Sequence, residues 1–321
     1  MTDLLATLGV YLTQFLAQAA WKFPEWSPAL FSIDFGFIGL GEFHLRWYAL
    51  GYIGGIAGAW WYATEMLKRP AIWGGEAPLS REAMDDLMFW IIIGIILGGR
   101  LGYVLFYMVP YQMDVLTADP LSILRIWDGG MAFHGGILGV VIVLWWFAAK
   151  RGVKLLSVGD IAGVTAPIGI GLVRIANFTN AELYGRPTES SIGMVFPEGY
   201  VPGSTPPAYN WEASEWVYRG DELARHPSQL YESVLEGWLP LIILSILVWK
   251  FGALKRPGLV AGLFLIMYGV GRSVAENFRE PDSFVSGLPE WLTMGMILSV
   301  PMWLGGAWLI WNALKRQEKQ V

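Results

Sequence analysis

Seven apolar runs, each about as long as a bilayer is thick, constrain the fold of this chain most strongly. A helix that crosses the hydrocarbon core needs about 20 mostly apolar residues. We predict spans near residues 43–63, 85–107, 130–149, 157–177, 235–252, 258–277 and 291–312. Only 15% of the 321 residues are charged, whereas soluble chains have about 25%. The sequence therefore predicts an all-α integral membrane protein with about seven transmembrane helices.

The distribution of Lys and Arg predicts how these helices are oriented. Basic residues collect in the cytoplasmic connections of membrane proteins. If the N-terminus lies outside, twelve of the 22 basic residues fall in cytoplasmic segments: Lys68, Arg69, Arg81, Lys150, Arg151, Lys154, Lys250, Lys255, Arg256, Lys315, Arg316 and Lys319. Lys22 is then the only Lys on the outer side. We therefore expect an N-out, C-in, multi-pass protein.

The spans divide the chain into four predicted parts. Residues 1–42 form an N-terminal interfacial or re-entrant segment, because they lack the basic start of a cleaved signal peptide. Residues 43–177 hold transmembrane helices 1–4, and residues 235–321 hold helices 5–7 with a cytoplasmic tail. Between them, residues 178–234 are rich in Pro, Gly, Trp and Tyr. Since long unstructured loops are uncommon, we expect a small, ordered head domain on the extracytoplasmic, periplasmic side.

The composition also excludes several kinds of chemistry. The chain has no Cys, which excludes disulfides, thiolate metal sites and a cysteine nucleophile of its own. Its net charge of −5 is spread over short loops and gives no basic face for nucleic acid. No cluster has the spacing of metal ligands, so we expect neither a metal nor another cofactor.

Ionisable residues inside or at the ends of the spans are the strongest functional signal. Arg100, Arg174, Arg272 and Glu276 lie in or beside predicted helices. A charge at the bilayer centre costs roughly 2.5–3.5 kcal/mol, so such side chains normally face the bundle interior or a wet cavity. In the predicted orientation Arg174, Arg272 and His134 all fall near the outer face. We expect them to converge on one site.

The residue types at this site favour a phospholipid ligand. The planar fork of an arginine pairs bidentately with phosphate or carboxylate, and phospholipid phosphate is the anion most available at that depth. Glu276, one turn after Arg272, can hold its guanidinium in place. Asn177, Asn180 and Tyr side chains can hydrogen-bond glycerol hydroxyls or esters. His134 is the natural candidate for a proton acceptor near neutral pH.

Each of these residues also has a purely structural interpretation. Arg100 is as well explained as a snorkelling or ion-paired residue between helices. In the structural interpretation, Arg272 and Glu276 form a buried ion pair that only stabilises the fold. His134 would be structural, as we expect for His44, and the glycines around it would serve only turns and close helix packing.

Several motifs, in order along the chain, resemble one family. They are Trp47-Tyr48, Gly98-Gly99-Arg100-Leu101-Gly102-Tyr103, the run from Asp128 to Gly136, residues 173–185, Arg225 to Glu232, and Arg272 through Asp282. From about residue 24 to 314 the sequence resembles the prolipoprotein diacylglyceryl transferases of bacterial inner membranes. The family usually has Gly at Val173, Ala176 and Ala181, and often His at Arg46. These substitutions bear more on backbone packing than on the chemistry.

The resemblance implies a reaction and a set of site residues. The diacylglyceryl group of phosphatidylglycerol would pass to the lipobox Cys thiol of a prolipoprotein signal peptide, with a thioether formed and glycerol phosphate released. The expected catalytic residues are Arg174, Arg272 and His134. The expected substrate-binding residues are Tyr48, Arg100, Asn177, Asn180, Glu182, Tyr268 and Glu276. The expected partners are membrane lipid, phosphatidylglycerol and the signal peptide, with no nucleic acid.

Two other classes of function stay open at the level of the residues. A transporter or channel for an anionic lipid or solute would use the same arginines as a binding site, although the chain shows no internal repeat. A non-catalytic scaffold would use the polar pairs only to lock its helices together. A covalent product on a lipobox peptide separates the transferase from both.

Overall fold

The structure, a computed structural model, describes residues 21–39, 42–126, 129–201, 204–218, 223–280, 289 and 292–318. The chain forms two compact units. Unit 1 comprises Met1–Ala59, Val164–Ser245 and Gly262–Trp308, and unit 2 comprises Trp60–Gly163, Ile246–Ala261 and Leu309–Val321. The predicted interfacial or re-entrant start of the chain, residues 1–20, lies outside the described residues.

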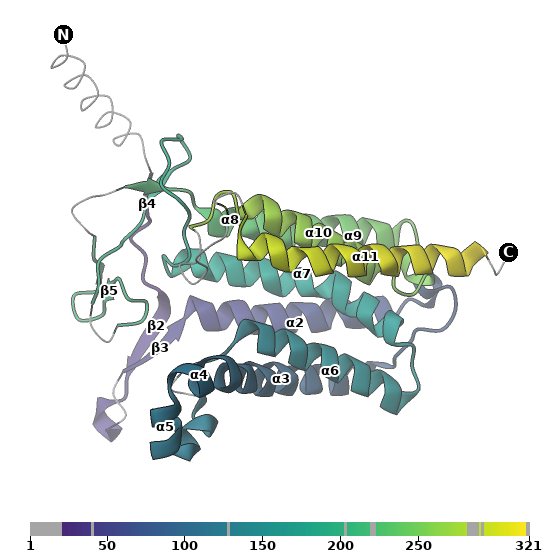
Figure 1. The fold of residues 1–321 in the computed structure, drawn as a ribbon, viewed down its shortest axis with the longest axis horizontal. Coiled ribbons are helices and arrows are strands. Elements are labelled where there is room, and N and C mark those ends of the chain that lie inside the picture. Colours follow the sequence, from purple (N-terminus) through teal and green to yellow (C-terminus); the bar gives the residue numbers. More distant parts are fainter. Residues whose placement is uncertain are drawn as a thin grey trace, which may run out of the picture. The chain divides into compact units, whose positions relative to one another are not determined.

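A long helix lies on each of the seven apolar runs (Figure 1). The helices are α2 (Trp47–Leu67), α3 (Arg81–Tyr103), α6 (Phe133–Arg151), α7 (Leu155–Thr179), α8 (Ser228–Glu232) continued by the π-helix η6 (Ser233–Trp238) and α9 (Leu239–Trp249), α10 (Leu259–Ala275) and α11 (Met294–Glu318). Shorter pieces connect them: η1 (Gly36–Ile38), η2 (Pro70–Trp73), the π-helix η3 (Val104–Met108), α4 (Val109–Tyr111), α5 (Met113–Ala118), η4 (Pro120–Leu124) and η7 (Ala253–Lys255).

Five of these helices are long and apolar enough to cross a membrane, among the described residues. They are Arg81–Tyr111, Phe133–Arg151, Leu155–Thr179, Ser228–Trp249 and Met294–Arg316. The α10 helix is apolar but has only 17 residues, and α2 is long but rich in Trp, Tyr and Gly. The prediction of a mainly helical, multi-pass membrane protein is confirmed. The count of seven and the orientation stay predictions.

Within unit 2, α3 and α6 run side by side because glycines line their contact (Figure 1). A Cβ added to Gly139 would lie 2.0 Å from the carbonyl oxygen of Gly94, and one added to Gly98 would lie 2.4 Å from that of Gly135. Small residues of this kind let helix backbones approach where lipid removes the usual hydrophobic drive. Arg100 and His134 belong to these two helices.

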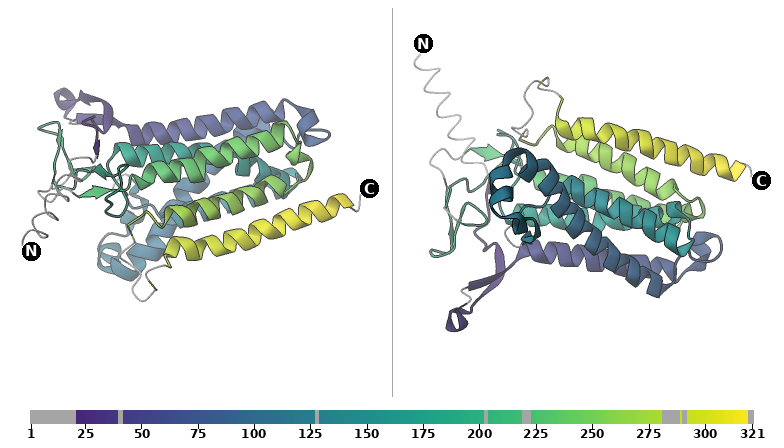
Figure 2. Two further views of the ribbon diagram at one scale, coloured as in Figure 1. Left: turned by 90° about the horizontal axis from the view of Figure 1, so that it is seen from above. Right: turned by 60° about the horizontal axis from the view of Figure 1, so that its bottom comes forward.

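Within unit 1, glycines bring the helices that carry the arginines close together. Gly55 of α2 faces Gly169 of α7, and Gly237 of η6 faces Gly171, again on α7. The hydroxyl of Ser233 also donates to the carbonyl of Gly171 (2.9 Å). The α10 and α11 helices lie alongside one another in both views of Figure 2. The end of α7, the start of η6 and the end of α10 are thereby brought together.

The expectation of an all-α fold is wrong in its detail, because short strands build the head. A three-stranded sheet has the order β1 (Trp21–Lys22), β4 (Met194–Val195), β7 (Ala224–Arg225), with β1 parallel and β7 antiparallel to β4. The strands β2 (Ala29–Asp34) and β3 (Glu42–Arg46) pair as an antiparallel hairpin, as do β5 (Tyr209–Asn210) and β6 (Glu215–Trp216). The pairing of β1 with β4 joins distant segments, which no local pattern specifies.

An aromatic core holds the head together. Its buried members are Phe23, Phe178, Ala181, Phe196, Ala208, Tyr209 and Trp216. The ring of Phe23 meets those of Phe178, Phe196 and Trp216 at centroid distances of 5.3–5.5 Å. The N-terminal segment that carries Phe23 and the loop after α7 therefore share one core.

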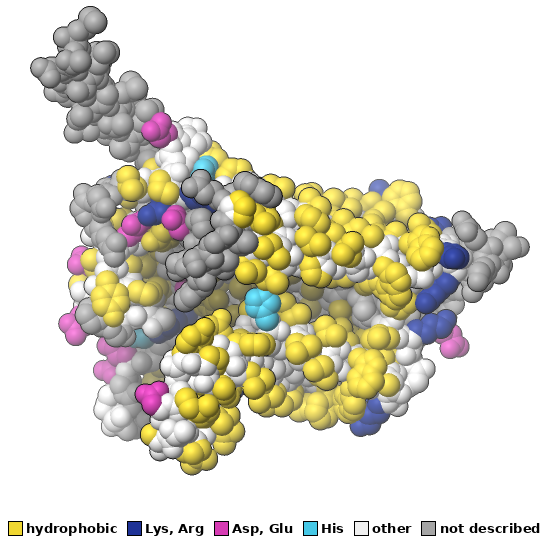
Figure 3. All heavy atoms as spheres, viewed as in Figure 1, with side chains coloured by type: hydrophobic (Ala, Val, Ile, Leu, Met, Phe, Trp, Pro, Cys, Tyr) yellow, Lys and Arg dark blue, Asp and Glu magenta, His cyan; other side chains and the backbone are white. Residues whose placement is uncertain are grey.

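The outer surfaces of the helices are apolar. On the face drawn in Figure 3, hydrophobic side chains cover the flanks of the helices, while Lys and Arg gather around the C-terminal end of α11. Leu97, Leu105, Ile142 and Trp145 are among the large exposed side chains. Exposed apolar flanks with basic ends are typical of helices that lie in lipid.

Candidate functional site

Three arginines and three glutamates form a buried ionic cluster in unit 1. A carboxylate oxygen of Glu232 lies 2.7 Å from Arg272 and 2.8 Å from Arg279, and its other oxygen lies 3.4 Å from Arg174. Glu236 pairs with Arg174 at 3.3 Å, and Glu276 pairs with Arg272 at 2.5 Å. Three positive and three negative side chains balance, which is how a protein keeps charges out of water.

The local folding of each element explains this convergence. Glu232 ends α8 and Glu236 lies in the π-helix η6 that follows, so both carboxylates are fully buried against α7 and α10. Arg272 and Glu276 are four residues apart at the end of α10, where side chains meet on one helix face. Single-turn π segments occur often at functional sites.

Arg174 and Arg272 keep part of their surface accessible. Their side chains are 17% and 16% exposed, whereas Glu232 and Glu236 are fully buried. Tyr268 of α10 lies within electrostatic range of Arg174, Arg272 and Glu236. The arginines thus present the open side of the cluster, and the carboxylates form its floor.

A second polar group lies where α7 ends. The side-chain amide of Asn177 donates to Glu182 (2.9 Å) and to the hydroxyl of Tyr48 (3.4 Å). Burial raises the pKa of Glu182, and side-chain hydrogen bonds from Asn177 and Asn180 oppose that rise. The amide oxygens of Asn177 and Asn180 are buried and have no hydrogen-bond partner among the residues that the structure describes. Buried oxygens without partners are rare in folded proteins, and they mark places where a ligand can donate.

Ala176 and Ala181, which stand where the family usually has glycine, lie near the end of α7 and in the turn that follows it. Ala181 and Leu183 have φ angles of +52° and +59°, in the left-handed region that favours glycine. Ala176 is buried, and its side chain lies 3.2 Å from where a Cβ on Gly51 would lie. The expectation that these substitutions bear on the backbone agrees with the conformation at Ala181.

Arg225 anchors the head to the segment after α10. Its guanidinium pairs with Glu198 and, at 3.0 Å, with Glu280, and it lies over the ring of Tyr184. Burial lowers the pKa of Arg225, but its hydrogen bond to Glu198 and the charge of that carboxylate raise it further, so the net shift is upward. Arg225 therefore stays charged and stabilises the head.

Arg100, in unit 2, is bound almost entirely by backbone. Its guanidinium donates to the carbonyl oxygens of Ser122 (2.5 Å), Ile123 (2.8 Å), Gly129 (2.6 Å) and Gly130 (2.9 Å). The side chain is buried and fastens the connection between α5 and α6 to α3. This geometry favours the structural interpretation of Arg100, and a role in substrate binding stays a prediction.

His134, also in unit 2, is exposed. It is the second residue of α6, and its ring meets that of Phe133 edge-on at 5.8 Å. An exposed imidazole at a helix start is accessible to a second molecule. His134 belongs to unit 2, whereas the arginine–glutamate cluster belongs to unit 1, and the proton acceptor role of His134 stays a prediction.

Sequence reasoning missed three members of the cluster, namely Glu232, Glu236 and Arg279. Glu232 ends the motif that runs from Arg225 to Glu232. It precedes the predicted span that begins at residue 235, so the sequence places it in the predicted head domain. The signal was the spacing: two glutamates four residues apart at the start of an apolar run. Within the described ranges no group of three His, Cys, Asp or Glu residues is arranged to hold a metal ion.

Comparisons with known proteins identify the family of this chain. The family model "Prolipoprotein diacylglyceryl transferase" matches residues 36–312. A phosphatidylglycerol–prolipoprotein diacylglyceryl transferase of Bradyrhizobium diazoefficiens is 45% identical over 296 residues, which are 92% of this chain and 94% of that protein. Proteins of the same name from Brucella anthropi and Brucella canis are each 42% identical, covering 95% and 93% of this chain and 98% and 95% of their own lengths. This chain belongs to the prolipoprotein diacylglyceryl transferase family.

Proposed function

We propose that the open side of the arginine–glutamate cluster is where this chain carries out its reaction. The chain transfers the diacylglyceryl group of phosphatidylglycerol to prolipoproteins. Arg174 and Arg272 hold the phosphate of the lipid, because planar guanidinium groups pair bidentately with phosphate oxygens. The acceptor is the thiol of a lipobox Cys in the signal peptide.

The loose pairing of Arg174 is the observation that carries this proposal. Its nitrogens lie 3.3 and 3.4 Å from the carboxylates of Glu236 and Glu232, whereas Arg272 has contacts of 2.7 and 2.5 Å. Charge-assisted N–H···O bonds are usually about 2.7–2.9 Å long. Arg174 therefore keeps donors that an incoming phosphate can use, while Arg272 is held firmly in place.

The same geometry suits the chemical step. The thiolate attacks the glyceryl carbon that carries the phosphate, so a C–S bond forms and the C–O bond breaks. The oxygen leaves with the electron pair as glycerol phosphate, which is where negative charge develops. Positive groups already fixed at that place stabilise the transition state without reorganising. The family resemblance implies His134, a residue of unit 2, as the acceptor of the thiol proton, independently of the geometry of the cluster in unit 1.

The remaining expected residues order the lipid around this phosphate. Asn177 and Asn180 present their buried amide oxygens to the glycerol hydroxyls. Tyr48 and Glu182 hold Asn177, Glu276 holds Arg272, and Tyr268 lies within electrostatic range of both arginines. Arg100 supports the fold of unit 2 through its backbone contacts, and its role in substrate binding stays the prediction of the family resemblance.

We propose the inner membrane of a bacterium as the location, with seven spans, the N-terminus outside and the C-terminus in the cytoplasm. The four predicted parts of the chain, including a periplasmic head at 178–234, belong to this arrangement. The exposed apolar flanks of the helices and the basic ends support it. The site then lies in the outer half of the bilayer, where a signal peptide emerges.

The test uses the purified full-length chain, phosphatidylglycerol and a lipobox peptide, read by mass spectrometry. We expect the peptide to gain one diacylglyceryl unit on its Cys. Arg174→Lys and Arg272→Lys should each lower the rate by about 10²-fold or more, since an ammonium cannot reproduce the fork. Arg151→Lys is the matched control, because Arg151 pairs with Asp86 on the surface of unit 2.

Two results contradict the proposal. Full activity in both arginine variants, with the control unchanged, rules out the phosphate grip. Movement of phosphatidylglycerol across a vesicle membrane without any covalent product on the peptide rules out the transferase itself.

A further inference from the structure

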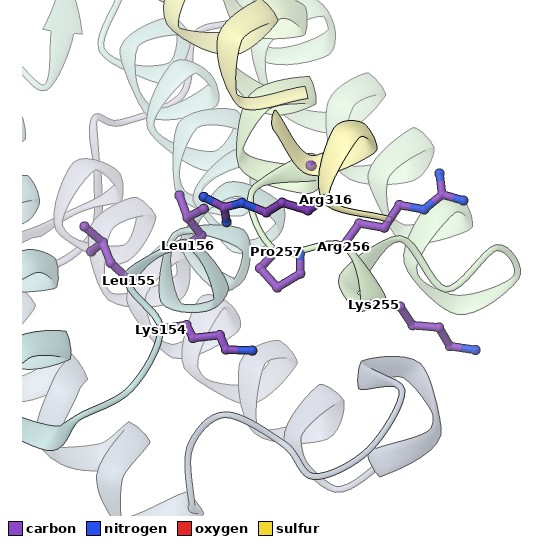
Figure 4. Close-up of a pocket in the computed structure, with 8 residues that line it drawn as sticks. Lys154, Leu155, Leu156, Lys255, Arg256, Pro257 and Arg316 are labelled. Carbon is purple, nitrogen blue, oxygen red and sulfur yellow. The ribbon is translucent and has the colours of Figure 1, made fainter. Parts of the chain in front are cut away.

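A pocket of about 440 Å³ lies in unit 2, and none of the residues of the arginine–glutamate cluster lines it. Four basic residues line it: Lys154, Lys255, Arg256 and Arg316. In Figure 4 the side chains of Lys154 and Arg316 lie on one side of Pro257, and those of Lys255 and Arg256 extend to the other. Three separate parts of the chain supply these charges.

The positive charge of this pocket is not balanced by the protein. No acidic residue is among those that line it. Within the described ranges, none of the four cations forms an ion pair, whereas Arg151 of the same unit pairs with Asp86 and Lys68 pairs with Glu65. Four like charges around one cavity repel one another unless an anion enters.

The position of the pocket selects the kind of anion. Lys154 directly precedes α7, Lys255 and Arg256 lie just before α10, and Arg316 lies in the last turns of α11. Each of these helices is apolar, so the pocket lies where helix ends meet the head-group layer. Leu156 and Ala313 complete its lining with apolar surface. Cations beside an apolar wall suit a phosphate that is attached to acyl chains.

We propose that this pocket binds the phosphate of an anionic phospholipid as a resident lipid, separate from the substrate. The phosphate lies between Lys154 and Arg316, and the glyceryl and acyl part lies along Leu156 and Ala313. In the proposed orientation the lipid comes from the cytoplasmic leaflet. The binding itself does not depend on the transferase reaction.

The test titrates the purified full-length chain with dioctanoyl phosphatidic acid, which is anionic but lacks the glyceryl head group of the proposed substrate, and counts bound lipids by native mass spectrometry. The double variant Lys154→Gln/Arg316→Gln should bind one lipid roughly tenfold to thirtyfold more weakly, because each basic residue near a lipid phosphate contributes about 1 kcal/mol. The control Lys250→Gln/Lys315→Gln removes the same charge from residues that do not line the pocket. It should bind like the unchanged chain.

Three outcomes overturn the proposal. In the first, the two double variants bind phosphatidic acid equally. In the second, dioctanoyl phosphatidylcholine binds at the same pocket as tightly as phosphatidic acid does. In the third, free glycerol phosphate binds as tightly as phosphatidic acid. Tight binding of free glycerol phosphate would show that the pocket binds a soluble phosphate compound and not a lipid. Diacylglyceryl transfer to a lipobox peptide is measured separately, so failure of the proposed function leaves this result readable.

A second measurement uses the unchanged chain and does not depend on how the variants fold. A phosphatidic acid with a photoreactive group on its acyl chain should cross-link to peptides that contain Leu156 or Ala313. Cross-links that spread evenly over the exposed helix flanks, with no excess at these peptides, would also overturn the lipid site.

Discussion

Glu232 is the residue on which the ionic cluster depends most. It is fully buried, and its two oxygens contact Arg174, Arg272 and Arg279. Arg272 also contacts Glu236 and Glu276, and Arg279 also contacts Glu276 at 3.5 Å. Removing the charge of Glu232 therefore takes away the one carboxylate that all three guanidinium groups share, and leaves three positive side chains facing two negative ones.

Glu232→Gln should destabilise unit 1 and lower activity together. Breaking a buried ion pair by removing one partner costs about 3–5 kcal/mol. The displaced arginines should also slow transfer by roughly 10²-fold, as small misplacements do elsewhere. Thermal unfolding in detergent and the lipobox peptide assay measure the two effects. Glu65→Gln is the control, because Glu65 pairs with Lys68 at the surface, where a pair contributes about 0–1 kcal/mol. Equal stability of the two variants would contradict this account.

His226, just before α8, should make the stability of the head depend on pH. Its ring lies 3.2 Å from the hydroxyl of Tyr231 and packs against Phe278, and burial lowers its pKa. The folded head therefore prefers the neutral ring, and the unfolded chain binds a proton more readily. Stability should be complete above the ordinary pKa of about 6.5 and fall as the pH drops below it. Unfolding temperatures should fall between pH 7 and pH 5 for the unchanged chain more than for His226→Gln, because glutamine binds no proton in this range. If His226→Gln lost as much stability between pH 7 and pH 5 as the unchanged chain does, this role of His226 would be contradicted.

At the residue scale, sequence reasoning could predict part of the ionic cluster but not the two carboxylates that form its floor. Arg174, Arg272 and Glu276 stand out because they are charges inside apolar runs. Glu232 and Glu236 lie at the edge of such a run, where a charge costs little and gives no signal. Their burial follows from the close approach of Gly237 to Gly171, which is a tertiary contact.

At the scale of elements, glycine pairs set how closely α3 and α6 pack. The sequence showed the glycines, and it left open which of them the helix contact requires. A Cβ on Gly139 would clash with backbone of Gly94, whereas one on Gly136 would find its nearest neighbour, the carbonyl oxygen of Ile95, at an ordinary 3.8 Å. Two neighbouring glycines on one helix therefore differ in their role.

Gly139→Ala should lower the thermal stability of the protein, and Gly136→Ala should leave it nearly unchanged. The first change forces α3 and α6 apart, and overpacking of this kind costs about 1–3 kcal/mol. The second adds a methyl group in open space. Unfolding temperatures in the same detergent compare the two. Similar stability of the two variants would show that the contact between Gly139 and Gly94 does not set the cost.

At the scale of the whole molecule, composition was enough to predict the class of protein. The short strands of the three-stranded sheet were not predictable, because β1, β4 and β7 have two residues each and pair across long stretches of the chain. The number of spans is also hard to derive. The α10 helix ends at Ala275, just before Glu276 joins the ionic cluster, so it is shorter than its apolar run.

The proposed orientation can be tested directly because the chain has no Cys. Glu212, on the exposed turn between β5 and β6, should lie outside the cell membrane, and Glu76, exposed between α2 and α3, should lie inside. A membrane-impermeant maleimide should label Glu212→Cys on intact spheroplasts and Glu76→Cys only after lysis. The unchanged chain gives the background. Labelling of Glu76→Cys from outside would reverse the orientation, and it would place the pocket at Lys154 and Arg316 in the outer leaflet.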